Sequence, residues 1–196
     1  METTVRLILC ETSDICADAL PFVSETDRAE AERCAQPDDK IVRLVSLCLK
    51  RKYIGSWSIG EHGKPVADGK FFNVSHTKGA VVLALADNDV GVDIERVRPT
   101  DKKFYAYVSR PDELAIITDD LSFFTVWTAK ESLVKAAGTG FDLHPKNVPV
   151  LPLIGTKTFK NNVYFSQQTV LGDLVVSVTR KGETPFSLVI EKETFN

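Results

Sequence analysis

Apolar residues along the first quarter of the chain follow two different periods, and each period predicts a different element. Segment 3–10 is rich in β-branched and aliphatic residues and predicts an opening strand. Segment 25–52 carries acids early and cations late, and its apolar residues recur at helical spacing. The residues of this apolar stripe are Ile41, Leu44, Val45, Cys48 and Leu49. Amphipathic helix is therefore predicted here, with Pro37-Asp38 opening a second helix.

The middle of the chain predicts a strand pair followed by helices. Segments 80–86 and 90–95 are apolar and flank the turn residues 87–89, so we predict a β-hairpin. Short helical stretches are expected within 101–117. A longer helix is predicted over 122–137, ended by the glycines that follow it.

Alternating apolar positions return in the last third. They predict strands at 162–169, 173–180 and 186–192. Helices and strands are thus mixed without a regular alternation, and no linker separates independent domains. The fold class is predicted to be α+β.

Composition narrows the functional class. The chain has 196 residues, of which 43% are hydrophobic and 26% charged, which suits a folded globular protein. Its net charge of −3 provides no basic field, so nucleic acid is not expected as a partner. The early apolar run 7–10 is too short for a signal peptide, so we expect a cytoplasmic protein without a membrane partner. The four cysteines form no C-x-x-C pair and are expected to be reduced thiols.

Two carboxylates lie two positions apart on a predicted strand. Asp93 and Glu95 therefore leave the same face of that strand. Paired carboxylates suit a hard cation such as Mg²⁺, which prefers oxygen ligands and often joins carboxylates to substrate phosphates. The same pattern also fits the solvated face of an edge strand.

A second set of polar residues follows on the predicted helix 122–137. Trp127, Glu131 and Lys135 are spaced four apart, so they line one helix face. An ordinary salt bridge beside a core tryptophan fits these residues equally well. Ser75, His76 and Lys64 lie next to predicted turns or strand ends, where they could bind a phosphate or form plain surface turns.

The order of five motifs along the chain resembles the surfactin-synthetase-type 4′-phosphopantetheinyl transferases. The motifs are Gly63-Lys64-Pro65, Phe72 to Thr77, Gly91 to Glu95, Trp127 to Lys135, and Gly138 to Phe141. The resemblance implies Mg²⁺-dependent transfer of the phosphopantetheine arm of coenzyme A to a serine of an acyl or peptidyl carrier protein. Adenosine 3′,5′-bisphosphate is the other product. Fatty-acid, polyketide and nonribosomal peptide synthesis are the pathways that such an enzyme would serve.

The resemblance assigns a role to each acidic motif residue. Asp93, Glu95 and Glu131 would bind Mg²⁺, or Mn²⁺, which has similar ligand preferences. Glu131 would also be the base for the carrier serine. Lys135 would neutralise or protonate the leaving group.

The resemblance assigns coenzyme A binding to other residues. Lys64, Ser75 and His76 would contact the nucleotide part. A basic residue on the first long helix should hold the 3′-phosphate, and Arg43 is the best-placed candidate.

The fold implied by the resemblance has two α+β halves, 1–97 and 98–196, related by a pseudo-twofold axis with coenzyme A between them. Because one chain would contain the whole cleft, we expect a monomer. Two other functions stay open from the residues alone. A Mg²⁺-dependent nuclease could use the same acids and lysine, and a non-catalytic module could bind coenzyme A or a carrier protein.

Overall fold

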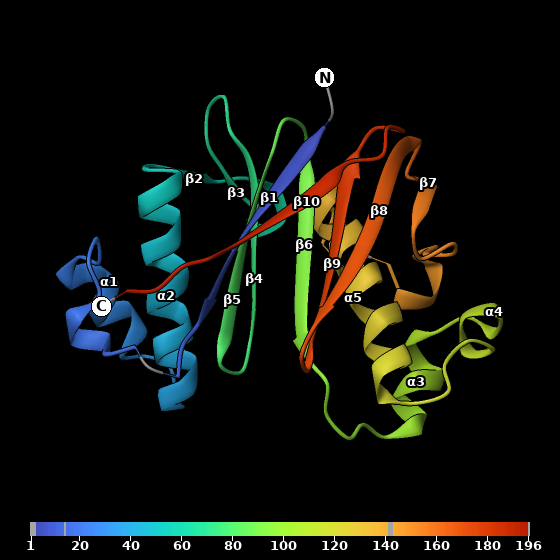
Figure 1. Cartoon of the computed structure of the whole chain (residues 1–196), viewed down its shortest axis with the longest axis horizontal. Helices are drawn as coiled ribbons and strands as arrows, with labels where there is room; N and C mark the ends of the chain where they lie inside the picture. The colour runs from blue at the N-terminus through green and yellow to red at the C-terminus, as the bar shows by residue number, and fades with distance from the viewer. Residues whose placement is uncertain (1–2, 14, 141–142, 196) are drawn as a thin grey trace.

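The computed structural model of the chain describes residues 3–13, 15–140 and 143–195. Its main elements form four layers: α2, a first sheet, a second sheet and α5 (Figure 1). The strands are β1 (Thr4–Glu11), β2 (Ser58–Ile59), β3 (Pro65–Val66), β4 (Phe71–Thr77), β5 (Ala80–Ala86), β6 (Val90–Arg96), β7 (Gly155–Phe159), β8 (Asn162–Leu171), β9 (Leu174–Lys181) and β10 (Ser187–Lys192). The α-helices are α1 (Glu25–Ala31), α2 (Pro37–Tyr53), α3 (Lys102–Val108), α4 (Pro111–Leu114) and α5 (Asp120–Ala137), and the short 3-10 helices are η1 (Ala17–Ala19), η2 (Glu61–Gly63) and η3 (Pro145–Asn147).

The first sheet has the order β10-β1-β5-β4, and α2 packs on its outer face. Strand β1 runs antiparallel to β5 and parallel to β10. The apolar stripe predicted for 25–52 lies in the core between α2 and this sheet, and Val45, Cys48 and Leu49 are fully buried there. Helix α2 begins at Pro37, whose fixed backbone and missing N–H suit the first helical turn.

The second sheet has the order β6-β9-β8-β7, and α5 packs on its outer face. All its strand pairs are antiparallel. The Asp119 side chain accepts a hydrogen bond from Ser122 N at 2.8 Å and caps the start of α5. Gly138 ends the helix in the left-handed conformation with φ 68°. A core of mainly aliphatic side chains from β1, β5, β6 and β9 fills the space between the two sheets.

The predicted fold class and most predicted elements are confirmed, but the predicted pairing of two strands is wrong. Strands β5 and β6 exist as expected, yet they form no hairpin, because both edges of β5 are taken by β1 and β4 while β6 pairs with β9. Strand β7 was not predicted. Strand β10 belongs to the second half of the chain in sequence, but it pairs with β1 in the first sheet.

Side chains rather than backbone ladders connect the two sheets where β4 meets β6. The side-chain oxygen Oδ1 of Asn73 accepts a hydrogen bond from Val92 N at 2.9 Å, and Thr77 Oγ1 accepts one from Arg96 N at 3.2 Å. Ser75 lies between them on the same side of β4 because strand side chains alternate. This junction places Ser75 opposite Asp93.

Within the described ranges, no helix is both long and apolar enough to cross a membrane.

Candidate active site

Asp93 lies at the centre of the predicted site residues. Its Oδ1 accepts hydrogen bonds from Lys135 Nζ at 2.6 Å and from Ser75 Oγ at 2.8 Å, and Lys135 Nζ also lies 2.9 Å from Ser75 Oγ. The other oxygen, Oδ2, is buried and has no hydrogen-bond partner among the described residues. Burial raises the pKa of Asp93, and although Lys135 and Ser75 lower it, the net shift is upward. One oxygen of this carboxylate is therefore left without a partner in the part of the chain that the structure describes.

Glu131 stands on α5 one turn before Lys135 and is half-buried. The described part of the chain offers its carboxylate no hydrogen bond or ion pair. Burial and, to a smaller extent, the charge of Asp93 raise the pKa of Glu131 to about 7, although the charge of Lys135 opposes them. Such a group gains and loses a proton near neutral pH, which is the range in which a general base works best.

Glu95 projects from the same face of β6 as Asp93. Its Oε2 accepts hydrogen bonds from Thr77 Oγ1 at 3.1 Å and from Arg98 at 2.8 Å. Arg98 is about half exposed, so this ion pair is open to water and easily exchanged.

A pocket of about 290 Å³ lies beside Glu131. Glu131 and Lys135 line it together with the turn that carries Lys64, whereas Asp93, Glu95 and Ser75 are not among its lining residues. The residues that line the pocket are His62, Gly63, Lys64, Pro65, Asn73, Val74, Glu131, Val134, Lys135, Gly138 and Gly140. Lys64 Nζ lies 3.4 Å from Val90 O and 3.5 Å from Ala136 O, and burial lowers its pKa. Phe141, the last residue of the matching motifs, lies outside the described residues.

His76 and Arg43 are not in this pocket. His76 follows Ser75 on β4, so it points to the opposite face and lines a separate hollow with Asp38, Asp39 and Val42. Arg43 is exposed on α2 and pairs with Glu30 at 3.1 Å.

Asp93, Glu95 and Glu131 provide the oxygen ligands that a divalent cation prefers, but the three carboxylates do not form a closed metal site. Among the residues that the structure describes, no three His, Cys, Asp or Glu side chains lie close enough to hold a metal ion. The charge of Glu95 nevertheless raises the pKa of Asp93, and the charges of Asp93 and Glu95 raise that of Glu131. A divalent cation would relieve this repulsion and give Oδ2 of Asp93 a partner.

Two groups of α5 residues beside the site were not predicted. Lys130 is fully buried and pairs with Glu113 at 2.8 Å, although in the sequence it resembles one more exposed helix charge. Thr128 and Ser132 form buried hydroxyl contacts with the second sheet. Polar residues at the core-facing positions of a mainly apolar helix are the signal that could have identified this pair.

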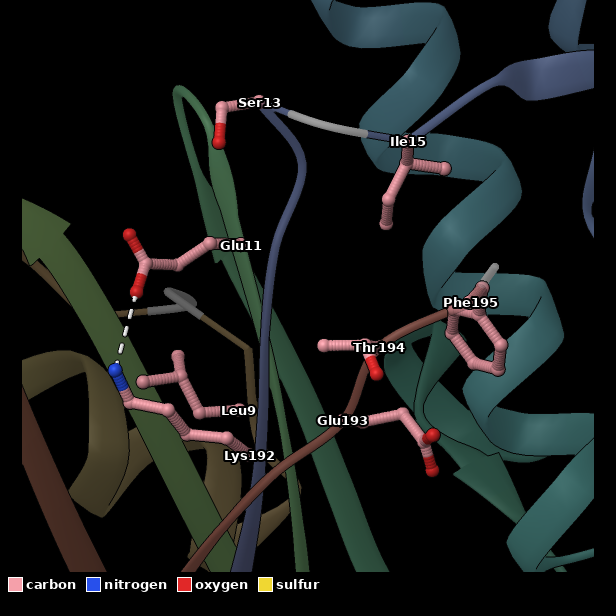
Figure 2. A pocket seen from close by; sticks show the side chains of 8 residues that line it. All are labelled: Leu9, Glu11, Ser13, Ile15, Lys192, Glu193, Thr194 and Phe195. Carbon is pink, nitrogen blue, oxygen red and sulfur yellow. Dashed lines mark ion pairs between the residues drawn. The ribbon is translucent and has the colours of Figure 1, made fainter.

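A second hollow of similar size, about 260 Å³, lies between the end of β1 and the C-terminal tail (Figure 2). None of the predicted site residues lines it. Glu11 pairs with Lys192 at 3.7 Å across its rim, and Glu193 is bonded to Lys52 and Tyr53. Both carboxylates are thus satisfied within the protein, and the hollow shows no chemistry comparable to that around Asp93.

The family model of the 4′-phosphopantetheinyl transferase superfamily matches residues 89–179. This segment contains Asp93, Glu95, Glu131 and Lys135. Two signatures at the centre of the resemblance therefore lie inside the matched region.

Curated relatives extend the match. The chain is 28% identical over 143 residues to the 4′-phosphopantetheinyl transferase Sfp of Bacillus subtilis, covering 63% of this chain and 64% of that protein. It is 38% identical over 87 residues to the transferase gsp of Aneurinibacillus migulanus, covering 41% of this chain and 37% of that protein. The match thus spans less than two thirds of these relatives. The transferase AcpT of Salmonella typhi is 34% identical over 145 residues, covering 68% of this chain and 74% of AcpT. On this similarity and the family model, the chain belongs to the 4′-phosphopantetheinyl transferase superfamily.

Proposed function

We propose that this protein transfers the 4′-phosphopantetheine group of coenzyme A to a serine of an acyl or peptidyl carrier protein. The products would be the holo-carrier protein and adenosine 3′,5′-bisphosphate. One observation supports this most strongly: Asp93, Ser75 and Lys135 are in mutual contact, and one buried Asp93 oxygen has no partner beside the pocket that Glu131 lines.

Asp93, Glu95 and Glu131 are proposed to hold Mg²⁺, with Mn²⁺ as a possible substitute. The ion would neutralise charge on the pyrophosphate of coenzyme A. This assignment rests on the unpartnered oxygen of Asp93 and on the mutual repulsion of the three carboxylates.

Glu131 and Lys135 are proposed to move protons and charge during transfer. The serine oxygen forms a bond to the phosphorus that carries pantetheine, and the bond from that phosphorus to the bridging oxygen breaks. Glu131 accepts the serine proton, directly or through water. The leaving adenosine 3′,5′-bisphosphate takes the electron pair, and Lys135 neutralises or protonates it. Positioning and charge neutralisation supply most of such a rate enhancement.

Coenzyme A is proposed to bind across β4. Lys64, which lines the pocket, and Ser75, which contacts the pocket residue Lys135, would contact it on one side, and His76 and the α2 residue Arg43 on the other. Arg43 already pairs with Glu30, and in the hollow at His76 the one lysine, Lys78, pairs with Asp38 while Asp39 adds a second negative charge. The 3′-phosphate of coenzyme A would therefore meet less positive charge than the resemblance implies. We therefore expect a weaker preference for that phosphate.

Two halves, 1–97 and 98–196, are proposed to be related by a pseudo-twofold axis. The order strand, long helix, hairpin occurs twice along the chain, first as β1, α2 and β4–β5 and then as β6, α5 and β8–β9, so the second copy begins with β6, just before residue 98. The corresponding sheet orders are β1-β5-β4 and β6-β9-β8. The cleft would then lie within one chain, which supports a monomer, with β10 returning to the first sheet.

A Lys135→Ala variant is expected to lower the maximal transfer rate about 100-fold and to change the Mg²⁺ dependence less, because the lysine acts chiefly on the leaving group. Steady-state kinetics at several Mg²⁺ concentrations measure both properties. An unchanged maximal rate would remove Lys135 from the chemistry.

The carrier protein is proposed to dock beside α3, near Glu95. Lys102 and Lys103 are exposed on α3, and among the described residues neither has an ion-pair partner. Arg98 and Arg96, by contrast, already pair with Glu95 and Asp173. Two unpaired cations this close in sequence to Glu95 suit an acidic protein surface.

Reversing both charges, Lys102→Glu with Lys103→Glu, is expected to raise the KM for the carrier protein about tenfold or more. The KM for coenzyme A should not change. Lys160→Glu, on the exposed β7–β8 turn, is the matched control and should change neither. If the double variant bound the carrier normally, the docking surface would lie elsewhere.

The function itself is tested by chromatography of a reaction that contains coenzyme A, Mg²⁺ and apo-carrier protein. Release of adenosine 3′,5′-bisphosphate that requires all three components supports the proposal. Cleavage of nucleic acid would instead favour a nuclease. Binding of coenzyme A without release would favour a non-catalytic module.

A further inference from the structure

Helix α5 contacts the second sheet through hydroxyl groups as well as aliphatic side chains. Thr128 Oγ1 lies 2.6 Å from Ser177 Oγ, and Ser132 Oγ lies 2.9 Å from Thr179 Oγ1. All four residues are fully buried. These two pairs are called the hydroxyl contacts of α5 below.

The hydroxyl contacts belong to a complete hydrogen-bond network. Gln168 Nε2 donates to Ser177 Oγ and to Thr125 O, both at 2.7 Å, and Ser166 Oγ lies 2.8 Å from Thr179 Oγ1. None of these hydroxyl or amide groups is among the unpartnered buried atoms of the described residues. A buried polar network adds little net stability over apolar packing, but its bonds are directional and specify one arrangement.

The opposite side of α5 is also held by polar contacts. Lys130 Nζ lies 2.8 Å from Glu113 of α4, 3.0 Å from Pro145 O and 2.9 Å from Val148 O. At 3.6 residues per turn, Lys130 points roughly 160° away from Thr128 around the helix axis. Two sets of directional contacts on opposite sides fix how far α5 can rotate about its own axis.

Glu131 lies between these two sets of contacts, three residues after Thr128 and one after Lys130. Helical side chains end about 5–6 Å from the axis, so a rotation of roughly 10° displaces a carboxylate by about 1 Å. A misplacement of this size can slow an enzyme about 100-fold. The rotation of α5 therefore decides whether Glu131 and Lys135 meet Asp93 correctly.

We infer that Thr128, Ser132 and Lys130 are positioning residues that set the rotation of α5, and with it the geometry of Glu131 and Lys135. Their contacts fix the orientation of α5 more than they add to the free energy of unfolding. This inference rests on the proposed transfer function.

The test is a double variant, Thr128→Val with Ser177→Ala, which replaces one hydroxyl contact by apolar groups of similar shape. It also removes the bond from Gln168 to Ser177, but Gln168 keeps its bond to Thr125 O. Its thermal midpoint should stay close to that of the wild type, and its KM for coenzyme A should change little. Its kcat for transfer should fall about 10- to 100-fold. A single Thr128→Ser variant, which keeps the hydroxyl and leaves Ser177 in place, should have nearly the wild-type kcat.

The control is Thr4→Val with Ser187→Ala, which removes an exposed hydroxyl pair 3.2 Å apart between β1 and β10. It should leave kcat unchanged. A normal kcat in the folded Thr128/Ser177 variant would overturn the inference. If that variant does not fold, Thr128→Val alone keeps the bond between Gln168 and Ser177, and a normal kcat there would overturn it equally. A wild-type protein without transfer activity would instead contradict the proposed function.

Discussion

Transfer is expected to fall by at least about 100-fold in an Asp93→Asn variant that is no less stable than the wild type. Asparagine keeps the size of Asp93 and can still bond to Ser75 and Lys135, but it is a far weaker metal ligand. Burial raises the pKa of Asp93 in the folded state above its ordinary value. The ionised carboxylate therefore costs folding free energy at neutral pH, and a neutral amide removes that cost.

The measurements are thermal unfolding and the transfer rate as Mg²⁺ is varied. Asp27→Asn is the matched control, because Asp27 is also buried but is bonded to Ser24 and Arg51, away from the pocket. Although burial opposes them, these bonds lower the pKa of Asp27, so its charge stabilises the fold. That control should lose stability and keep transfer. Normal turnover by Asp93→Asn would remove Asp93 from the mechanism.

A Gly91→Ala variant is expected to lose both stability and transfer. A Cβ atom at Gly91 would lie 2.1 Å from Ser132 O and 2.3 Å from Ala136 N, both in the backbone of α5. Backbone cannot move aside as a side chain can, so α5 must shift away from β6 and carry Glu131 and Lys135 with it. Overpacking of this kind costs about 3 kcal/mol or more of folding free energy.

The comparison for Gly91→Ala is Gly172→Ala at the β8–β9 turn. Gly172 has φ 64° and no atom within 4 Å of the added Cβ, so its cost is limited to about 1 kcal/mol of backbone strain. Denaturant unfolding and transfer kinetics measure both variants. A Gly91→Ala protein with wild-type stability and rate would show that α5 does not need this close contact.

Local patterns predicted individual elements well because period, caps and turn residues act over short distances. The end of α5 at Gly138 and the start of α2 at Pro37 are confirmed examples. Strand pairing was harder to predict. The turn at 87–89 suits a hairpin, but which strands pair depends on β1, β4 and β9, which lie far away in sequence.

The site shows the same contrast between local and long-range information. Spacing on one strand or one helix predicted that Asp93 and Glu95 share a face and that Glu131 and Lys135 share another. That Asp93 and Lys135 lie 2.6 Å apart depends on the packing of α5 against β6, which spacing alone cannot give. The motif order suggested that both sets belong to one site. Lys130 was missed because a buried and an exposed lysine look alike in a helical pattern.

The most direct test of the proposed transfer is intact-mass spectrometry of an apo-carrier protein incubated with this protein, coenzyme A and Mg²⁺. A parallel reaction contains a chelator. The carrier is expected to gain the mass of one phosphopantetheine group, and the chelator is expected to abolish the gain. No gain with acyl and peptidyl carriers, while coenzyme A still binds, would contradict the account and favour a non-catalytic module.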